Sequence, residues 1–82
     1  MTENTLGKRL LRLRTRKGYT QKYVGSHVYV TSVAVSQWET GKRRPGYEEL
    51  ISLANLYGVS INYFFMKEVD KWVKKILNKL MK

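Results

Sequence analysis

Residues 19–41 constrain this chain most, because they predict two short helices joined by a tight turn. Thr20 and Thr31 each carry a hydroxyl that suits the N-cap of a helix, and each precedes a short run with apolar residues at helical spacing. We expect the first helix to extend to about His27 and the second to about residues 38–40. The second helix would then present small, neutral side chains on its outer face.

The charge around this helix pair is one-sided. No acidic residue lies between Glu3 and Glu39, whereas seven Lys and Arg do, and the whole chain has a formal net charge of +10. A field of this sign attracts polyanions and accelerates their encounter, although it does not define a fold. A compact helix pair in a positive field therefore indicates a protein that reads DNA through the major groove.

Apolar residues recur at helical spacing in four other segments, which are 5–17, about 46–57, 61–65 and 67–81. Ser60 is the expected N-cap of the third segment. The residues that should face the core in the first four helices of the chain are Leu6, Leu10, Leu13, Val24, Val28, Val35, Trp38, Leu50, Leu53, Ala54 and Tyr57. The pattern predicts an all-α fold, with a compact domain of five helices followed by an amphipathic C-terminal helix.

Gly25 lies inside the first helix of the pair, where a glycine costs about 1 kcal/mol relative to alanine. A residue without a Cβ is favoured there if another part of the protein approaches closely. We therefore expect a second helix to cross at Gly25, so that the position is constrained by size and not by chemistry.

Several functional classes are disfavoured by composition. The chain has 82 residues, enough for one domain, and it has no Cys, so neither a disulfide framework nor a thiolate metal site is expected. Its single His27 cannot form a zinc site alone. No apolar run approaches the roughly 20 residues of a membrane span, and the N-terminus lacks the order of a signal peptide. We expect a cytoplasmic protein without a cofactor, and we find no constellation of catalytic residues, so an enzyme is not expected.

Four sequence segments together resemble the phage repressor/Cro-type helix-turn-helix domain, also called the XRE type. They are Thr20-Gln21, Val30-Thr31, the run from Ser36 to Pro45 and the run from Leu53 to Ser60. The resemblance covers roughly residues 5–65, and it implies a DNA-binding domain at 1–66 with a separate helix at 67–82. The chain departs from the family at Tyr29, where Gly is usual, and at Gly25, where Ala is preferred. A tyrosine with positive φ costs about 1–2 kcal/mol, so we expect either a reshaped turn or a packed ring at position 29.

The resemblance also implies roles for individual residues. In the family, the second helix of the pair enters the major groove and touches base edges, which here assigns base contacts to Ser32, Val33, Ser36 and Gln37. Gln suits adenine, Val suits a thymine methyl group, and Ser is permissive. Phosphate contacts are assigned to Thr20, Gln21, Thr31, Thr40, Lys42, Arg43 and Arg44. The family pairs the positions of Arg14 and Glu39 as a salt bridge, which we expect to be structural first.

The C-terminal helix is open to three interpretations. It is favoured as a dimerisation element, because paired half-sites require paired proteins, and its contact residues would be Val69, Trp72, Val73, Ile76 and Leu80. Alternatively it folds back onto residues 63–65 of its own domain. The third interpretation, a Lys-rich helix lying on a membrane, is weakened by Glu68 and Asp70, and no membrane partner is expected.

Two functions follow from these features. The first is a transcriptional regulator, in particular a repressor that binds a double-stranded, pseudo-palindromic operator as a homodimer, with RNA polymerase or a regulatory protein as a further partner. The second is an antitoxin-type module that binds DNA and uses its C-terminal helix to hold a partner protein. The oligomeric state of the isolated chain distinguishes them.

Overall fold

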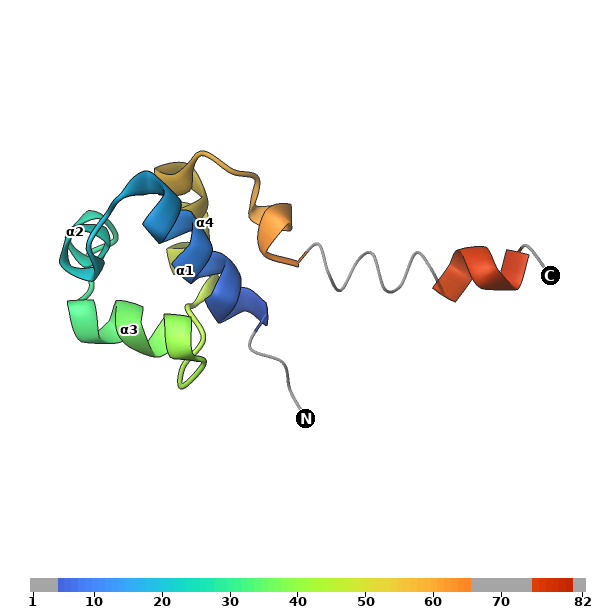
Figure 1. The fold of residues 1–82 in the computed structure, drawn as a ribbon, viewed down its shortest axis with the longest axis horizontal. Coiled ribbons are helices and arrows are strands. Elements are labelled where there is room, and N and C mark those ends of the chain that lie inside the picture. The colour runs from blue at the N-terminus through green and yellow to red at the C-terminus, as the bar shows by residue number, and fades with distance from the viewer. Residues whose placement is uncertain (1–4, 66–74, 81–82) are drawn as a thin grey trace.

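The structure, a computed structural model, describes residues 5–65 and 75–80 (Figure 1). Its elements are α1 (Thr5–Lys17), α2 (Gln21–His27), α3 (Ser32–Thr40), α4 (Tyr47–Tyr57) and the 3-10 helix η1 (Ile61–Phe65). Residues 75–80 are also helical, and no strand occurs in either described range. The predicted all-α class and the five helices of the domain are confirmed. The rest of the predicted 67–81 helix lies outside the described residues.

The core forms where the apolar faces of these helices meet. All eleven residues predicted to face inward are buried, from Leu6 to Tyr57, and Phe64 of η1 joins them. Leu53, Val24 and Val35 are the largest side chains that are almost fully enclosed. Helix α3 packs against both α1 and α2 (Figure 1). Its orientation is therefore set by two neighbours, whereas its remaining face is left to solvent.

Side chains form hydrogen bonds at the starts of α2, α3 and α4, where the sequence predicts that these helices begin. The hydroxyl of Thr20 accepts a hydrogen bond from the backbone N–H of Tyr23 at 3.0 Å, and that of Thr31 accepts one from Ala34 at 3.2 Å. The carboxylate of Glu49 accepts from the backbone N–H of Gly46 at 2.7 Å, at the start of α4. These contacts satisfy backbone donors that a helix start leaves without an intrahelical partner.

The turn between α2 and α3 differs from both expectations for Tyr29. This residue takes the left-handed conformation with φ of 62°, so the turn is not reshaped. Its side chain is 95% exposed, so the ring is not packed either. The backbone N–H of Val30 instead holds the turn closed by donating to the carbonyl of Gly25 at 2.8 Å.

Gly25 is constrained by size, but the expected neighbour was wrong. A Cβ at this position would lie 2.7 Å from the carbonyl oxygen of Val30 and 3.1 Å from the carbonyl carbon of Thr31. The close approach is therefore made by the backbone of the turn and of the α3 N-cap, and not by a crossing helix. Gly25 lets the turn fold directly onto α2.

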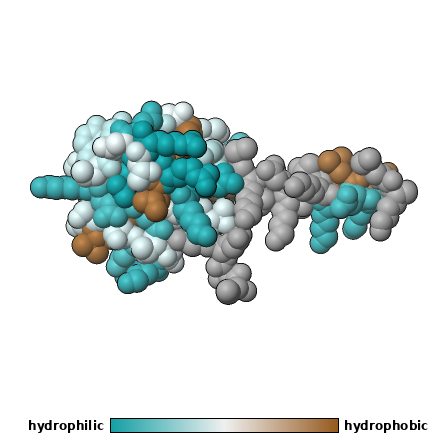
Figure 2. Space-filling model, viewed as in Figure 1, coloured by the Kyte–Doolittle hydropathy of each residue, from teal (hydrophilic) through white to brown (hydrophobic). Residues whose placement is uncertain are grey.

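The outside of the domain is largely polar. Figure 2 shows hydrophilic residues over much of the visible face, with few separate hydrophobic patches. Among the described residues, no helix is both long enough and apolar enough to cross a membrane.

Candidate nucleic-acid interface

An open hollow lies along the solvent-facing side of α3. Its lining consists of Gln21, Ser32, Val33, Ser36, Gln37, Thr40 and Lys42. All four residues assigned to base contacts are in this set, together with three of the seven assigned to phosphate. The structure thus brings side chains from α2, α3 and the following loop to one surface.

The lining side chains differ in exposure in a way that suits contact with a ligand. Val33 is 63% exposed and Ser32 is exposed as well, whereas Ser36 and Gln37 are half-buried. An exposed valine at the start of a helix adds nothing to the core, but it offers an apolar surface. Gln37 offers both a donor and an acceptor from a partly fixed position.

Thr20 and Thr31 lie at the N-terminal ends of the two helices that border the hollow. Each hydroxyl oxygen already accepts a backbone N–H, as a cap, and both residues are exposed. A hydroxyl can accept and donate at the same time, so its proton remains suited to an acceptor such as a phosphate oxygen. The capping contacts fix the direction in which these hydroxyls point.

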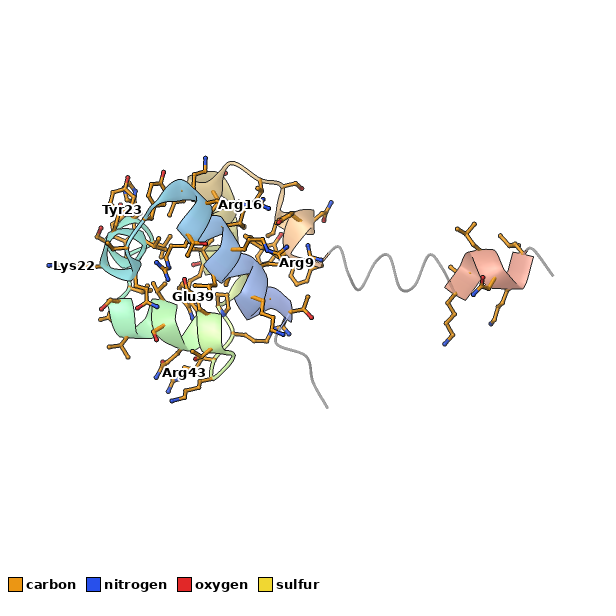
Figure 3. The ribbon with its side chains drawn as sticks, in the orientation of Figure 1. Arg9, Arg16, Lys22, Tyr23, Glu39 and Arg43 are labelled. Carbon is orange, nitrogen blue, oxygen red and sulfur yellow. The ribbon has the colours of Figure 1, made fainter. Side chains whose placement is uncertain are left out.

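The C-terminal end of α3 leads into the basic loop. The Thr40 hydroxyl donates to the carbonyl of Ser36 at 3.0 Å, so it would have to rotate in order to donate to a ligand. The backbone N–H of Arg43 donates to the carbonyl of Gln37 at 3.2 Å, which ties the loop to α3. Lys42, Arg43 and Arg44 are all exposed, and Figure 3 shows Arg43 beside α3.

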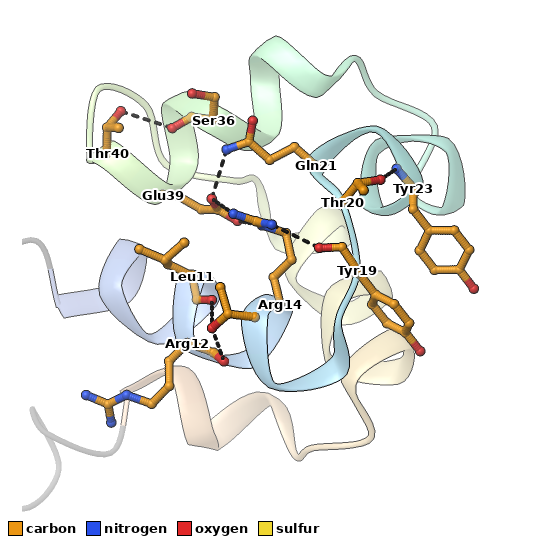
Figure 4. A network of polar contacts seen from close by, with 11 residues as sticks. Leu11, Arg12, Arg14, Tyr19, Thr20, Gln21, Tyr23, Ser36, Glu39 and Thr40 are labelled. Atoms are coloured by element: carbon orange, nitrogen blue, oxygen red, sulfur yellow. Dashed lines mark hydrogen bonds and ion pairs between the residues drawn. The ribbon is translucent and has the colours of Figure 1, made fainter.

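A buried ion pair holds α3 against α1. Arg14 donates from Nε to Glu39 Oε2 at 2.7 Å and from Nη2 to Oε1 at 3.1 Å, and its Nη1 donates to the carbonyl of Tyr19 at 2.9 Å. The Glu39 side chain is only 4% exposed and that of Arg14 is 15% exposed. The hydrogen bond to Glu39 raises the pKa of the Arg14 guanidinium, so the cation is favoured. The two residues paired by the resemblance are thus in bidentate contact (Figure 4).

Gln21 connects this ion pair to the hollow. Its amide Nε2 donates to Glu39 Oε1 at 3.0 Å, while the residue also lines the hollow (Figure 4). This contact could not be predicted from the sequence, because it depends on the angle between α2 and α3. One carboxylate therefore links α1, α2 and α3 directly beneath the candidate interface.

Two other groups of contacts were missed from the sequence. Arg9 of α1 donates from Nη1 to the carbonyl of Tyr63 at 2.8 Å, and its guanidinium lies 5.3 Å from the centre of the Tyr63 ring. The rings of Tyr19, Tyr23 and His27 form a continuous row, hereafter the aromatic row, with 4.5 Å between successive ring centres. Their spacing of four residues was the available signal for the row.

Only some of the predicted dimerisation residues are among those that the structure describes. Val69, Trp72 and Val73 lie outside the described residues. In the helical residues 75–80, Ile76 is half-buried and Leu80 is 75% exposed. Over the two described ranges, no three His, Asp or Glu residues are grouped as a metal site would require.

Comparison with known proteins gives a consistent result. Residues 10–64 match the helix-turn-helix family. The HTH-type transcriptional regulator ImmR of Bacillus subtilis is 40% identical over 68 residues, which are 82% of this chain and 54% of that protein. The HTH-type transcriptional activator BcrR of Enterococcus faecalis is 37% identical over 54 residues, which are 66% of this chain and 26% of that protein. The chain thus spans about half of ImmR and about a quarter of BcrR.

A solved structure extends the comparison to the fold. The P22 c2 repressor in complex with a synthetic operator superposes with a TM-score of 0.71 and 32% sequence identity. The match covers 77% of this chain and 94% of the repressor chain.

Proposed function

The chain belongs to the helix-turn-helix family, and from this premise we propose that it is a DNA-binding transcriptional regulator that places α3 in the major groove of its operator. One observation carries the proposal, namely that all four side chains assigned to base contacts line a single open hollow along α3. Helix α3 is held by α1 and α2 and leaves its polar face open. A helix held in this way can enter the major groove.

The chemistry of the hollow suits base edges. Gln37 can pair with adenine through its amide, and Val33 can contact a thymine methyl group. Each good base contact discriminates by about 1–3 kcal/mol, so two or three of them are enough for a preferred sequence. Ser32 and Ser36 then contribute contacts that tolerate several bases.

The rim of the hollow suits the phosphate backbone. Thr20 and Thr31 would donate their hydroxyl protons to phosphates on one side, and Lys42, Arg43 and Arg44 would pair with phosphates on the other. Such contacts fix the register of the protein without specifying the sequence. Gln21 is assigned here to positioning, because its amide is already held by Glu39.

We further propose that two copies bind one pseudo-palindromic operator and repress transcription in the cytoplasm, with residues 67–82 joining the copies. The apolar spacing of that segment and the extensive match to a repressor chain support this arrangement. One relative is named as an activator, so the direction of regulation is the part of the proposal that most needs a promoter assay.

In vitro selection of duplex sites with the full chain, at moderate salt, tests the proposal. Enriched sites should contain two inverted half-sites about 10 base pairs apart, centre to centre. Enrichment of single half-sites would refute the dimer but leave DNA reading intact. Failure to enrich any duplex above the starting pool would refute the function itself.

A further inference from the structure

We propose that the aromatic row, which begins just before α2 and continues along it, is a docking surface for a carboxylate-rich, amphipathic segment of a partner protein, which binds while α3 is on DNA. The position of this surface relative to bound DNA rests on the proposed function, but the existence of the aromatic row does not. Its three rings are contributed by Tyr19, Tyr23 and His27, and it continues inward to the buried Tyr57, whose ring centre is 6.4 Å from that of Tyr19.

The row faces away from the candidate DNA interface. On a helix, positions 21 and 23 are about 200° apart around the axis, so their side chains leave α2 on nearly opposite sides. Gln21 points toward Glu39 and the hollow, whereas Tyr23 points away from both (Figure 4). In Figure 3, Tyr23 and Arg43 likewise lie at opposite edges of the domain. A duplex held against α3 therefore leaves the row accessible.

Tyr23 lies between two other rings. Tyr23 has a ring neighbour on each side along the row, at 4.5 Å in both directions, with interplanar angles of 42° and 53°. Rings at this distance on both sides of Tyr23 leave less room for a nucleic-acid base to stack on it. Phenol groups can donate hydrogen bonds to carboxylates, and the edges of aromatic rings carry partial positive charge, so the chemistry of the row suits an anionic partner.

The surroundings favour the same occupant. Arg16, Lys17 and Lys22 are exposed next to the row in sequence, and the chain has no acid between Glu3 and Glu39. A second copy of this chain would bring two basic faces together, which opposes association through the row. Tyrosines already locked against one another lose little further freedom on binding, which is why such residues serve as anchors in interfaces. Tyr23 is 41% exposed, so part of its surface is left for a partner to cover.

A displayed library of helical peptides provides the probe. It would be selected on the full chain bound to a duplex from the site selection, with single-stranded oligothymidine as a competitor. Enriched peptides should alternate acidic and apolar residues, and they should bind the Tyr23→Ala variant at least about tenfold more weakly than wild type, as expected for loss of an anchor. Tyr47→Ala removes another exposed tyrosine, which is 71% exposed on α4, and should leave peptide affinity unchanged.

Two additional variants distinguish a loss of peptide binding from a loss of folding. Lys22→Glu keeps the rings and should weaken acidic peptides, while His27→Ala shortens the row at its exposed end. Both should retain wild-type circular dichroism, and His27→Ala should also retain wild-type duplex affinity. Equal binding to wild type and Tyr23→Ala, competition by duplex, or displacement by oligothymidine would overturn the inference. If the chain binds no duplex, the proposed function fails, but the same peptide measurements on the free chain still decide whether the row docks a partner.

Discussion

Replacing Arg14 with methionine should destabilise the domain far more than replacing any exposed arginine. The guanidinium makes two hydrogen bonds to Glu39 and a third to the carbonyl of Tyr19. Methionine retains an apolar stem but removes all three donors, so a carboxylate that is only 4% exposed loses its cation.

The size of the effect follows from this geometry. Removing one member of a buried ion pair costs about 3–5 kcal/mol, because a charge is left without its partner. Gln21 still donates to Glu39, and water reaches the 15% of the Arg14 side chain that is exposed, so we expect the lower end, about 3 kcal/mol. At about 0.05–0.15 kcal/mol per residue, the 82 residues have a total stability of only about 4–12 kcal/mol. The variant would therefore retain a stability of only about 1–9 kcal/mol.

Urea denaturation of the full chain, followed by far-ultraviolet circular dichroism, measures this difference. Arg16→Met is the matched control, since Arg16 is exposed on the same helix, and its effect should stay within about 0.5 kcal/mol. The pKa of Arg14 is raised in the folded state, so its ion pair contributes stability at pH values below the pKa of arginine in the unfolded chain. This stability is lost only as the pH rises above that value, in strong alkali. The guanidinium of wild-type Arg14 should therefore be charged at both pH 6 and pH 8.

A double variant makes the reasoning refutable. Arg14→Met with Glu39→Met removes both charges, so it should be more stable than Arg14→Met alone, because no carboxylate is buried without its cation. If Arg14→Met costs no more than Arg16→Met, or if the two single effects simply add in the double variant, the pair does not hold α3 in the way described.

Four other predictions concern the interface, the buried Tyr57, the turn and the C-terminal segment. Gln37→Ala should change the sequence preference with little effect on the salt dependence of binding. Arg43→Ala should weaken binding to all duplexes and reduce the salt slope by about one. If Gln37→Ala lowers the affinity for specific and random DNA equally, Gln37 does not read bases. Burial, reinforced by the charge of Glu39, raises the pKa of Tyr57, so stability should be intact at neutral pH and fall as pH rises above about 10, where the unfolded phenol ionises. Urea unfolding of Tyr57→Phe should lack this part of the alkaline loss. Tyr29→Gly should relieve about 1–2 kcal/mol of backbone strain, offset by about 0.4–1 kcal/mol of chain entropy, while Gly25→Ala should lower the urea midpoint because its Cβ meets the Val30 carbonyl. Deleting residues 67–82 should weaken operator binding through lost dimerisation, and unchanged sedimentation and affinity would rule this out.

The helices could be predicted because their signals are local. Leu6, Leu10 and Leu13 define one face of a helix by spacing alone, and a threonine before an apolar run defines its start. These features do not depend on the rest of the molecule, so the bounds of the domain helices agree closely with the structure. The turn was less predictable. Whether Tyr29 packs or is exposed depends on what surrounds it in three dimensions, and spacing holds no information about that.

The grouping of the candidate residues on one surface was predictable, but their hydrogen-bond connections were not. The resemblance assigned Ser36 and Gln37 to the interface, and the structure brings them to one hollow. The resemblance gave no reason to expect that Gln21 would donate to Glu39, because that contact depends on the angle between α2 and α3. The aromatic row had a visible signal in its spacing of four, but i and i+4 rings on a helix are as common in packed surfaces as in binding sites.

Helix α2 therefore separates two roles by the direction of its side chains. Gln21 is coupled through Glu39 to Arg14, so changes on that side should alter both stability and DNA reading. Tyr23 contacts its ring neighbours and lies on the other side of the same seven-residue helix, so changes there should leave the Glu39 network in place. A short helix serves two partners independently if its two faces are energetically uncoupled. If the two faces are uncoupled in this way, the combined effect of Gln21→Ala and Tyr23→Ala should equal the sum of the two within about 0.5 kcal/mol. A larger deviation would mean that the two faces communicate through α2, and a partner on the row would then alter DNA binding directly.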